Sequence, residues 1–356
     1  MSPTYKAAAL LAIRPALIIA LLLLHPRAAF SAGSVWLGTA PDMAVFIQWT
    51  ERQGQLSGQL QATWIASDYG YSAKWHVWAA TIKVQSTNRP FTGIRNGGSI
   101  TLHFFDYGQN WTGTIRGKTL ELVAPLRSGA LSTLVLRPGT IEGYNQAVSS
   151  LYKLVATNNE RAYVRAAVLA RRLDLLRTLR TLLGDVENVQ RISDFSHTLA
   201  PYPEILRQME EIRREIRTEA ARQPLSCFDL GTIQFKLGVA QMRFGSLELT
   251  NGSFSTHRNN LLRAMSETEE TMAHAVATLH KLKTAVAADS TRTMSPDVLA
   301  GYESETWSRL KWADKELQAA RTRLSNAEQS VRSYTERGRS LLNDMEALVR
   351  SLKCEG

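Results

Sequence analysis

An apolar repeat with a step of seven residues runs from Leu230 to Val286, and glycines keep the same step beside it. A step of seven keeps one stripe of a helix facing a partner helix, as in a coiled coil. Two features argue against a helix. The alternation from Ile233 to Val239 suits a strand, and each glycine destabilises a helix by ~1 kcal/mol relative to alanine. Because the repeat continues as far as Val286, it predicts one long helix. Its core positions, fourteen of seventeen apolar, are Leu230, Ile233, Leu237, Ala240, Phe244, Leu247, Asn251, Phe254, Arg258, Leu261, Met265, Thr268, Met272, Ala275, Leu279, Leu282 and Val286.

A second repeat of the same period follows, from Leu310 to Leu352. Between the two repeats, Ser295 is suited to cap a helix, and Pro296 fits the first helical position, where a missing N–H costs nothing. We therefore expect a long antiparallel coiled-coil hairpin over residues 226–355, with its tip near residue 291. Its second set of core positions is Leu310, Ala313, Leu317, Ala320, Leu324, Ala327, Val331, Tyr334, Gly338, Leu341, Met345, Leu348 and Leu352.

The glycine row of the first repeat consists of Gly231, Gly238, Gly245 and Gly252. Glycines spaced in this way make a flat track on a helix, because no side chain projects from it. We expect a third helix to approach closely along this track.

The two cysteines, Cys227 and Cys354, lie at the far ends of the predicted hairpin. Antiparallel arms of equal length would bring both thiols to the same end, and disulfides form in exported proteins. The spacing therefore predicts an intramolecular disulfide, which would stabilise the hairpin by about 4–5 kcal/mol in the chain-entropy model. Free thiols and an intermolecular bond are the alternatives.

The N-terminus carries Lys6 and Arg14 before a short apolar core over residues 16–24. A membrane-spanning helix needs about 20 apolar residues, so this segment predicts a signal peptide over residues 1–31. Small residues place the cleavage after Ser31, and an uncleaved N-terminal anchor is the alternative. We expect an exported protein that is secreted, periplasmic or held at the cell surface.

Net charge bears on the partners of such a protein. Removal of residues 1–31 takes away Lys6, Arg14 and Arg27 and no acidic residue, which lowers the net charge from +10 to +7. A basic exported chain meets anionic membrane surfaces or cell-surface polymers, whereas its compartment argues against nucleic acid. The alternative is that the charge serves solubility alone.

Composition changes near residue 140, since thirteen of 22 Gly and six of eight Trp lie before it. Residues 33–140 contain short alternating apolar segments separated by glycine turns, with a weak repeat of residues 91–102 in residues 111–122. This pattern predicts a small antiparallel β-barrel or sandwich. The fold class is therefore α+β, with a β domain followed by long antiparallel coiled-coil helices.

An aromatic cluster in the β domain includes Trp64, Tyr69, Tyr71, Trp75 and Trp78. Residues 66–72 have the composition of a loop, so Tyr69 and Tyr71, with Trp75, are the candidate ligand-binding residues. Exposed aromatic rings at a barrel mouth stack on sugars or hold an apolar ligand. The alternative is that they fill a small β core.

Residues 143–223 predict a helical hairpin whose first helix is basic. Its apolar positions again step by seven, Gly184 and Asp185 suggest where it ends, and a second helix follows Pro201. The arginines Arg161, Arg165 and Arg172 are candidates for contact with an anionic surface. Alternatively, they form a solvated face partly neutralised by glutamates of the second helix. We expect two hairpins side by side, a four-helix arrangement. The positions are Val148, Val155, Ala162, Leu169, Leu176 and Leu183, widened by Tyr152, Ala166 and Leu173, and the glutamates are Glu210, Glu211 and Glu215.

Motifs for catalysis, phosphate binding or zinc binding are absent from the sequence, and its seven histidines form no cluster with ligand spacing. We therefore expect no catalytic residue, cofactor or metal, and a non-enzymatic scaffold in which a coiled-coil rod presents a small β domain. Its partner would be another protein or a second copy bound through the coiled coil. The alternative is a β-barrel that binds a glycan or a small apolar ligand on a helical stalk.

Overall fold

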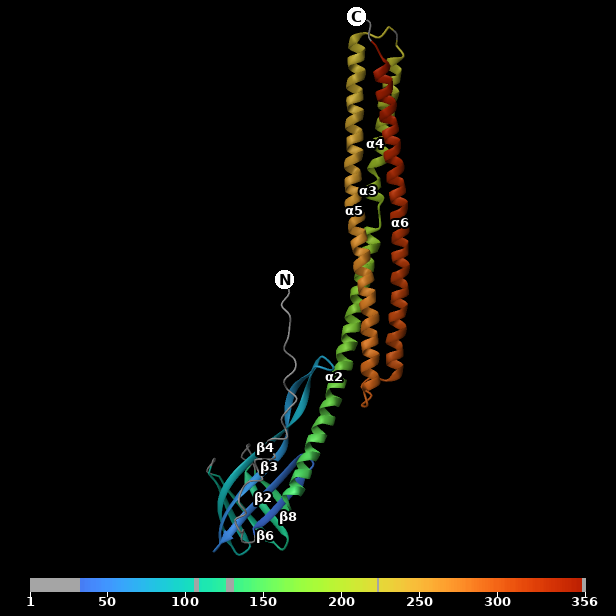
Figure 1. Cartoon of the computed structure of the whole chain (residues 1–356). Coiled ribbons are helices and arrows are strands. Elements are labelled where there is room, and N and C mark those ends of the chain that lie inside the picture. The colour runs from blue at the N-terminus through green and yellow to red at the C-terminus, as the bar shows by residue number, and fades with distance from the viewer. Residues whose placement is uncertain (1–32, 106–108, 126–130, 223, 354–356) are drawn as a thin grey trace. The chain divides into compact units, whose positions relative to one another are not determined.

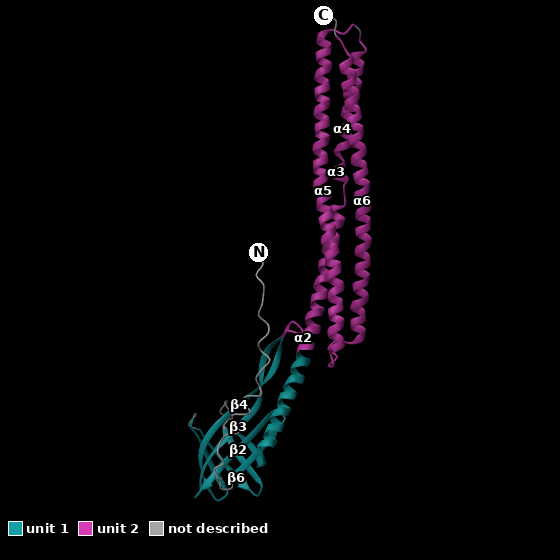
Figure 2. Cartoon of the chain, in the orientation of Figure 1, with its two compact units in different colours: residues 1–71, 78–162 teal, residues 72–77, 163–356 magenta. Residues whose placement is uncertain are grey.

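The computed structural model describes residues 33–105, 109–125, 131–222 and 224–353. They form an antiparallel β-barrel followed by long helices, which confirms the α+β fold class (Figure 1). The chain divides into two compact units (Figure 2): unit 1 comprises residues 1–71 and 78–162, and unit 2 comprises residues 72–77 and 163–356. The predicted signal peptide, residues 1–31, lies outside the described residues.

Unit 1 is a closed barrel in which each strand pairs with its neighbours in sequence and β8 pairs with β1. Of the two architectures expected, the structure has the barrel. Tight turns at Gly97 and Gly117, both with φ of 58°, join β4 to β5 and β6 to β7, as the internal repeat predicts. The strands are β1 Ser34–Ala40, β2 Met43–Arg52, β3 Gln55–Ser72, β4 Val77–Asn96, β5 Ser99–Phe104, β6 Gln109–Arg116, β7 Thr119–Pro125 and β8 Leu131–Pro138.

Apolar side chains fill the barrel interior, because alternate residues of each strand point inward. Gly58 makes room for the Phe91 ring, since a Cβ there would lie 2.8 Å from Phe91 Cζ and 2.7 Å from Trp49 Cβ. The alternating apolar residues of β2, β5 and β7 point into this interior, as the alternation in residues 33–140 suggests. The buried interior consists of Trp36, Val45, Ile47, Trp49, Leu56, Leu60, Phe91, Ile100, Leu102, Phe104, Leu120, Leu122 and Leu136.

Strand β2 is buried on its outer face as well, which the alternating pattern did not predict. Ala44 and Phe46 pack there against Tyr144 and Leu151 of helix α2, Ile141–Ile192. The Tyr144 hydroxyl forms a buried hydrogen bond of 2.7 Å with Thr63 Oγ1 of β3. The first turns of α2 therefore complete the core of unit 1.

Helices α5, Cys227–Ala288, and α6, Pro296–Ser351, form the predicted antiparallel pair (Figure 1). In the first repeat, every position that steps by seven from Ile233 to Leu282 is buried. The connection between the helices has the predicted cap, because Ser295 Oγ accepts a hydrogen bond from the Val298 N–H at 3.3 Å. Asp289 orders this connection by accepting hydrogen bonds from Thr291 N at 2.9 Å and Thr293 N at 2.6 Å.

The expected close approach along the glycine row of α5 is wrong. A Cβ at Gly231, Gly238, Gly245 or Gly252 would meet no described atom within 4 Å. Close packing occurs instead at Gly338 of α6, where a Cβ would lie 3.2 Å from Leu247 Cδ1 and 3.5 Å from a methyl carbon of Leu206 in α4. The sequence shows where the glycines are, but the packing of the third helix decides at which glycine the helices approach closely.

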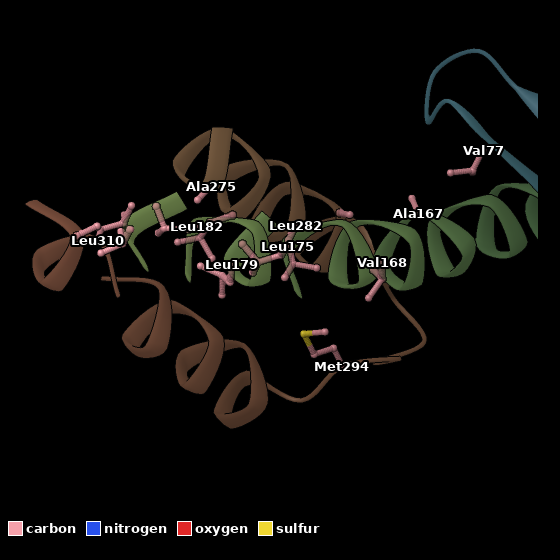
Figure 3. Packing of buried hydrophobic residues seen from close by; sticks show 14 residues of the cluster. Val77, Ala167, Val168, Leu175, Leu179, Leu182, Ala275, Leu282, Met294 and Leu310 are labelled. Atoms are coloured by element: carbon pink, nitrogen blue, oxygen red, sulfur yellow. The ribbon is translucent and has the colours of Figure 1, made fainter. Parts of the chain in front are cut away.

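The expected four-helix arrangement is also wrong, because unit 2 is a three-helix bundle. Helix α2 continues through Gly184, and α3, Ser196–Leu199, and α4, Pro201–Ala220, follow it. The end of α2 packs on the α5–α6 pair near its tip (Figure 3), whereas α4 packs near its open end. Within unit 2, residues 163–220 thus run along the pair as one interrupted helix rather than as a hairpin.

The buried stripe of α2 lies one residue away from the one expected. Val168, Leu175 and Leu182 are buried, whereas Leu169 and Leu176 are exposed. Both rows step by seven, so the period alone did not distinguish them; contact with α5 and α6 decides which is buried.

Candidate functional site

Three exposed aromatic rings gather on strands β3 and β4, which extend beyond the pairing with β2 and β5. Tyr69 and Trp78 stack with ring centroids 5.7 Å apart and an interplanar angle of 8°, and Tyr71 lies 5.3 Å from Trp78. The side chains of Tyr69, Tyr71 and Trp78 are 64%, 47% and 58% exposed. Residues 66–72 are therefore strand, not the loop that their composition suggested.

The third candidate, Trp75, belongs to unit 2, whereas the three rings belong to unit 1. Trp75 lies in the connection between β3 and β4 and packs, partly buried, on the cluster of unit 2 that includes Val77. Arg171 Nη2 donates a hydrogen bond of 3.4 Å to its carbonyl oxygen. Tyr69 and Tyr71 are thus joined by Trp78, the aromatic residue that falls on the same face across the hairpin.

The arginines predicted to contact an anionic surface lie on α2 in different surroundings. Arg161 and Arg165 are exposed one helical turn apart. Arg172 Nε donates a 2.7 Å hydrogen bond to the Tyr302 hydroxyl of α6, and its guanidinium lies over that ring. Arg172 therefore connects two helices of the bundle, which leaves Arg161 and Arg165 as the better candidates for an anionic partner.

The glutamates expected to neutralise these arginines have other partners. Glu210 pairs with Arg337 of α6, and Glu215 pairs with Lys236 of α5 at 2.8 Å. Glu211 pairs with Arg207 of its own helix. Glu210 and Glu215 therefore join α4 to α6 and α5, whereas Glu211 stays paired within α4.

A polar site that the sequence reasoning missed lies where α2 ends and α3 begins. His257 of α5 spans this break: its Nε2 lies 2.6 Å from the Ile192 carbonyl oxygen, and its Nδ1 lies 3.2 Å from Thr198 Oγ1. Because a carbonyl oxygen only accepts, Nε2 donates to Ile192, and in the neutral imidazole Nδ1 is then the acceptor for the Thr198 hydroxyl. The imidazole thus satisfies a terminal carbonyl of α2 that has no helical partner.

On the opposite side of the break, Arg323 of α6 donates a 2.7 Å hydrogen bond to the buried Ser193 hydroxyl. Asp194 accepts a hydrogen bond from the Ser196 N–H, which lowers the pKa of its carboxyl. A groove of about 560 Å³ opens beside these residues, and a second of about 470 Å³ lies beside Thr198 and His257. The pattern Ser193-Asp-Phe-Ser196 before Pro201 was the available sequence signal for the break.

This arrangement holds a helix break rather than a set of reacting groups. The Thr198 hydroxyl lies against His257 as a nucleophile lies against its base. However, the other ring nitrogen, Nε2, forms a hydrogen bond with a backbone carbonyl, whereas a catalytic triad has a carboxylate there. Among the described residues, no group of three or more His, Cys, Asp or Glu side chains is placed to hold a metal ion.

A polar layer crosses the bundle at the one asparagine among the core positions of α5. The Tyr202 hydroxyl of α4 donates a 2.8 Å hydrogen bond to Asn251 Oδ1, and Asn251 Nδ2 donates to Thr335 Oγ1 of α6 at 3.2 Å. Tyr202 is completely buried, and its ring stacks on Tyr334. Asn251 is partly buried. A polar residue at a core position of a helical seam fixes register, so this layer sets how the three helices align.

Comparison with known proteins adds little to this geometry. No protein-family model matches the chain, and no curated protein matches it. A solved structure described as "Computationally designed three helix bundle" is similar over 60% of this chain and 95% of its own length, with 11% identity and a TM-score of 0.22. A TM-score at that level carries no argument. Within the described part of the chain, no helix has the length and apolar character needed to span a bilayer.

Proposed function

We propose that this protein is an exported, non-enzymatic scaffold in which a coiled-coil rod presents a small β-barrel to its partners. The observation that carries the proposal is the buried seam of α5, which continues from Ile233 to Leu282. At ~1.5 Å per residue, the 62 residues of α5 extend about 93 Å. A helix pair of this length holds two sites apart at a set distance.

The polar contacts of unit 2 support a structural rather than a catalytic role. The side chains at the helix break, His257 and Arg323, bond to Ile192 and Ser193 of the segment they hold. Their hydrogen-bonding groups are thus used within the bundle. We propose accordingly that the protein acts by binding and has no catalytic residue.

Export and a disulfide are part of the proposal. Cys227 begins α5, and Leu225 and Leu352 belong to the same buried cluster at the open end of the hairpin. Cys354 lies outside the described residues, two positions after Leu352. A disulfide between Cys227 and Cys354 would close the hairpin at that end, which suits an oxidising compartment.

The proposed partners are a protein bound through the coiled coil and, through Arg161 and Arg165, an anionic cell-surface polymer or membrane surface. The net charge of +7 without residues 1–31 supports the second partner. Nucleic acid is not proposed. Binding of the full chain to anionic vesicles and its loss in the double variant Arg161→Ala, Arg165→Ala would support this contact, and equal binding by both would remove it.

Two measurements test the scaffold. Small-angle scattering of the chain from residue 33 onward must give a largest dimension of at least ~90 Å, as the length of α5 requires; a much smaller value would contradict the rod. Photo-crosslinking in the source cell, from exposed positions on the barrel and on α6, must then capture defined proteins. Labelling of no protein from any position would contradict the scaffold role.

A second candidate function is ligand binding by unit 1, which the exposed Tyr69, Tyr71 and Trp78 favour. Because apolar side chains fill the barrel interior, we propose the outer face of β3 and β4 as the site of such a ligand. A glycan array and a thermal-shift screen of the full chain test it. A hit that is lost in Trp78→Ala and kept in Trp64→Phe supports ligand binding, and no hit across broad panels removes it.

A further inference from the structure

Helix α5 carries a second apolar row on the face opposite its buried seam. Phe228, Phe235, Met242 and Leu249 step by seven and are 84%, 71%, 65% and 78% exposed. We call these four residues the outer row. Single exposed apolar residues are common, but four large ones in a heptad step over 22 residues of one helix are not a scattered set.

The glycines Gly231, Gly238, Gly245 and Gly252 follow the outer row, each three positions after one of its residues. A Cβ at any of them would meet no described atom within 4 Å, so the row has open space beside each large side chain. Positions three and four apart are neighbours on a helix. This face therefore alternates knobs with holes, which is what a coiled-coil partner requires.

No residue of this face is charged. On the flank opposite the glycines lie Thr232, Val239, Ser246 and Ser253. Glycine destabilises a helix interior, and a face turned to solvent ordinarily carries charged residues. The face thus has neither the composition of a solvated surface nor a partner among the described residues.

We propose that the outer row is a self-association seam, on which a second copy of this chain packs its own α5 in the antiparallel direction. An antiparallel pair centred near Ala240 sets Phe228 opposite the partner's Gly252 and Phe235 opposite the partner's Gly245. The same two-fold axis sets Met242 and Leu249 opposite the partner's Gly238 and Gly231. Every large side chain then enters a glycine hole.

The parallel arrangement does not fit. Parallel coiled coils in register pair like positions, so Phe235 would meet Phe235 and Gly238 would meet Gly238, which crowds one layer and leaves the next empty. A two-fold antiparallel interface uses the same patch twice and closes on itself. The order of large residues and glycines is therefore complementary to itself in one direction only.

The area involved is sufficient for a dimer. A large aromatic side chain buries roughly 150–250 Å², so the exposed parts of the four residues bring on the order of 500 Å² from each copy. Two copies together reach about 1,000 Å², where specific interfaces begin. This inference rests on the proposed scaffold function, because it names a second copy as the partner of the coiled coil.

Sedimentation equilibrium of the full chain tests the seam. Wild type should give twice the chain mass at micromolar concentration, and the double variant Phe235→Glu, Met242→Glu should weaken the dimer at least 100-fold. The matched control, Leu173→Glu with Trp307→Glu, alters residues that are 56% and 51% exposed elsewhere in unit 2 and should leave the dimer intact. A wild type that stays monomeric at ~100 μM overturns the inference, whatever else covers the row.

A second variant separates loss of the dimer from loss of the fold. Gly238→Leu with Gly245→Leu fills the holes while raising helix propensity, so it should abolish the dimer and leave helix content unchanged. Dimerisation undiminished in this variant overturns the inference. A monomeric wild type with a largest dimension of ~90 Å removes the seam and keeps the scaffold, whereas a compact particle removes the scaffold.

Cross-linking tests the direction. Phe235→Cys and Gly245→Cys chains should form a disulfide with each other when mixed, and neither should form one with its own kind through the new cysteine. The wild-type chain, which keeps Cys227 and Cys354, controls for the native thiols. Cross-links between like positions alone overturn the antiparallel seam.

Discussion

The side-chain amide of Asn159 on α2 exchanges two hydrogen bonds with the backbone of Ile82 on β4. Asn159 Oδ1 accepts from the Ile82 N–H at 2.9 Å, and Asn159 Nδ2 donates to the Ile82 carbonyl at 2.8 Å. The amide thus takes the place of a neighbouring strand at a position beyond the residues of β4 that pair with β5. It satisfies backbone groups that an edge strand leaves exposed.

Replacement of Asn159 by alanine should lower the free energy of unfolding of unit 1 by about 1–3 kcal/mol, because two partly buried backbone groups lose their partner. Tryptophan fluorescence during denaturant unfolding reports on the barrel core. The control is Asn158→Ala. It removes the same kind of side chain from the adjacent residue, whose side chain has no hydrogen bond described. Equal effects in the two variants would contradict the role of the amide.

Asp289 should make the free energy of unfolding of unit 2 depend on pH in the acid range. Burial raises the pKa of this carboxyl, but hydrogen bonds from Thr291 and Thr293 outweigh burial and lower it to about 2. The stabilisation is therefore complete above the unfolded pKa near 4 and is lost as the pH falls through 2. Asp289→Ala should cost about 1–2 kcal/mol at pH 7 and progressively less toward pH 2.

Unfolding followed by circular dichroism at pH 7, 4 and 2.5 measures this difference. Asp314→Ala, which removes an exposed carboxylate from α6, should show no comparable pH dependence. A constant difference between wild type and Asp289→Ala across the three pH values would show that the connection does not use the charge.

Tyr202 should produce the opposite dependence at alkaline pH. Burial raises its pKa to about 12, so the folded state keeps the hydroxyl protonated while the unfolded state ionises near pH 10. Its stabilisation is present below pH 10 and is lost as the pH rises toward 12. Tyr202→Phe should cost about 1–2 kcal/mol at pH 7, because Asn251 loses its donor, and that deficit should shrink above pH 10.

Absorbance titration of tyrosine ionisation, together with denaturant unfolding at pH 8 and 11, checks this. Tyr152→Phe is the control, since Tyr152 is 58% exposed. If the deficit of Tyr202→Phe is the same at pH 8 and pH 11, the hydroxyl is not held protonated by the bundle.

Two glycines of α6 should respond in opposite directions to substitution. Gly338→Leu should destabilise unit 2 by about 1–3 kcal/mol, because the site already lies against Leu247 and Leu206 and added methylenes overpack it. Gly301→Ala should stabilise the helix by about 0.5–1 kcal/mol, because its surroundings are open and alanine favours a helix. Thermal unfolding measures both, and destabilisation by both would contradict the difference in packing.

Thiol chemistry decides the proposed disulfide. Alkylation of the denatured protein without reductant should modify neither Cys227 nor Cys354, and peptide mapping should recover the two joined. Cys354→Ser should leave one thiol reactive and lower the stability of unit 2. Two reactive thiols in protein purified from its own compartment would remove the disulfide from the proposed function.

The helical seams were largely predictable because a heptad repeat encodes its own geometry. The buried rows of α5 and α6, the cap at Ser295 and the barrel strands follow from local spacing. The third helix was not predictable in the same way. Leu175 and Leu176 both continue a seven-residue step in α2, and contact with α5 and α6 buries only the first.

The candidate sites show the same division between local and distant information. Tyr69 and Tyr71 were predicted as an exposed pair, but Trp78 joins them because of how β3 and β4 pair. His257 was one of seven unclustered histidines, and only the packing of α5 against the break in α2 gives it a role. Both groupings depend on contacts between residues far apart in the sequence, so local sequence patterns could not predict them.

The seven-residue connection ordered by Asp289 has a consequence for how unit 2 assembles. Closing a short loop costs little chain entropy, so we expect α5 and α6 to zip from residue 289 outward, with protection in pulsed hydrogen exchange appearing there first. On the ribosome, the start of α5 can pack on α4 as soon as it emerges, but it meets α6 only when the last turns of α6 have been made. The buried seam of this part of α5 is therefore covered by α4 alone until the chain is nearly complete.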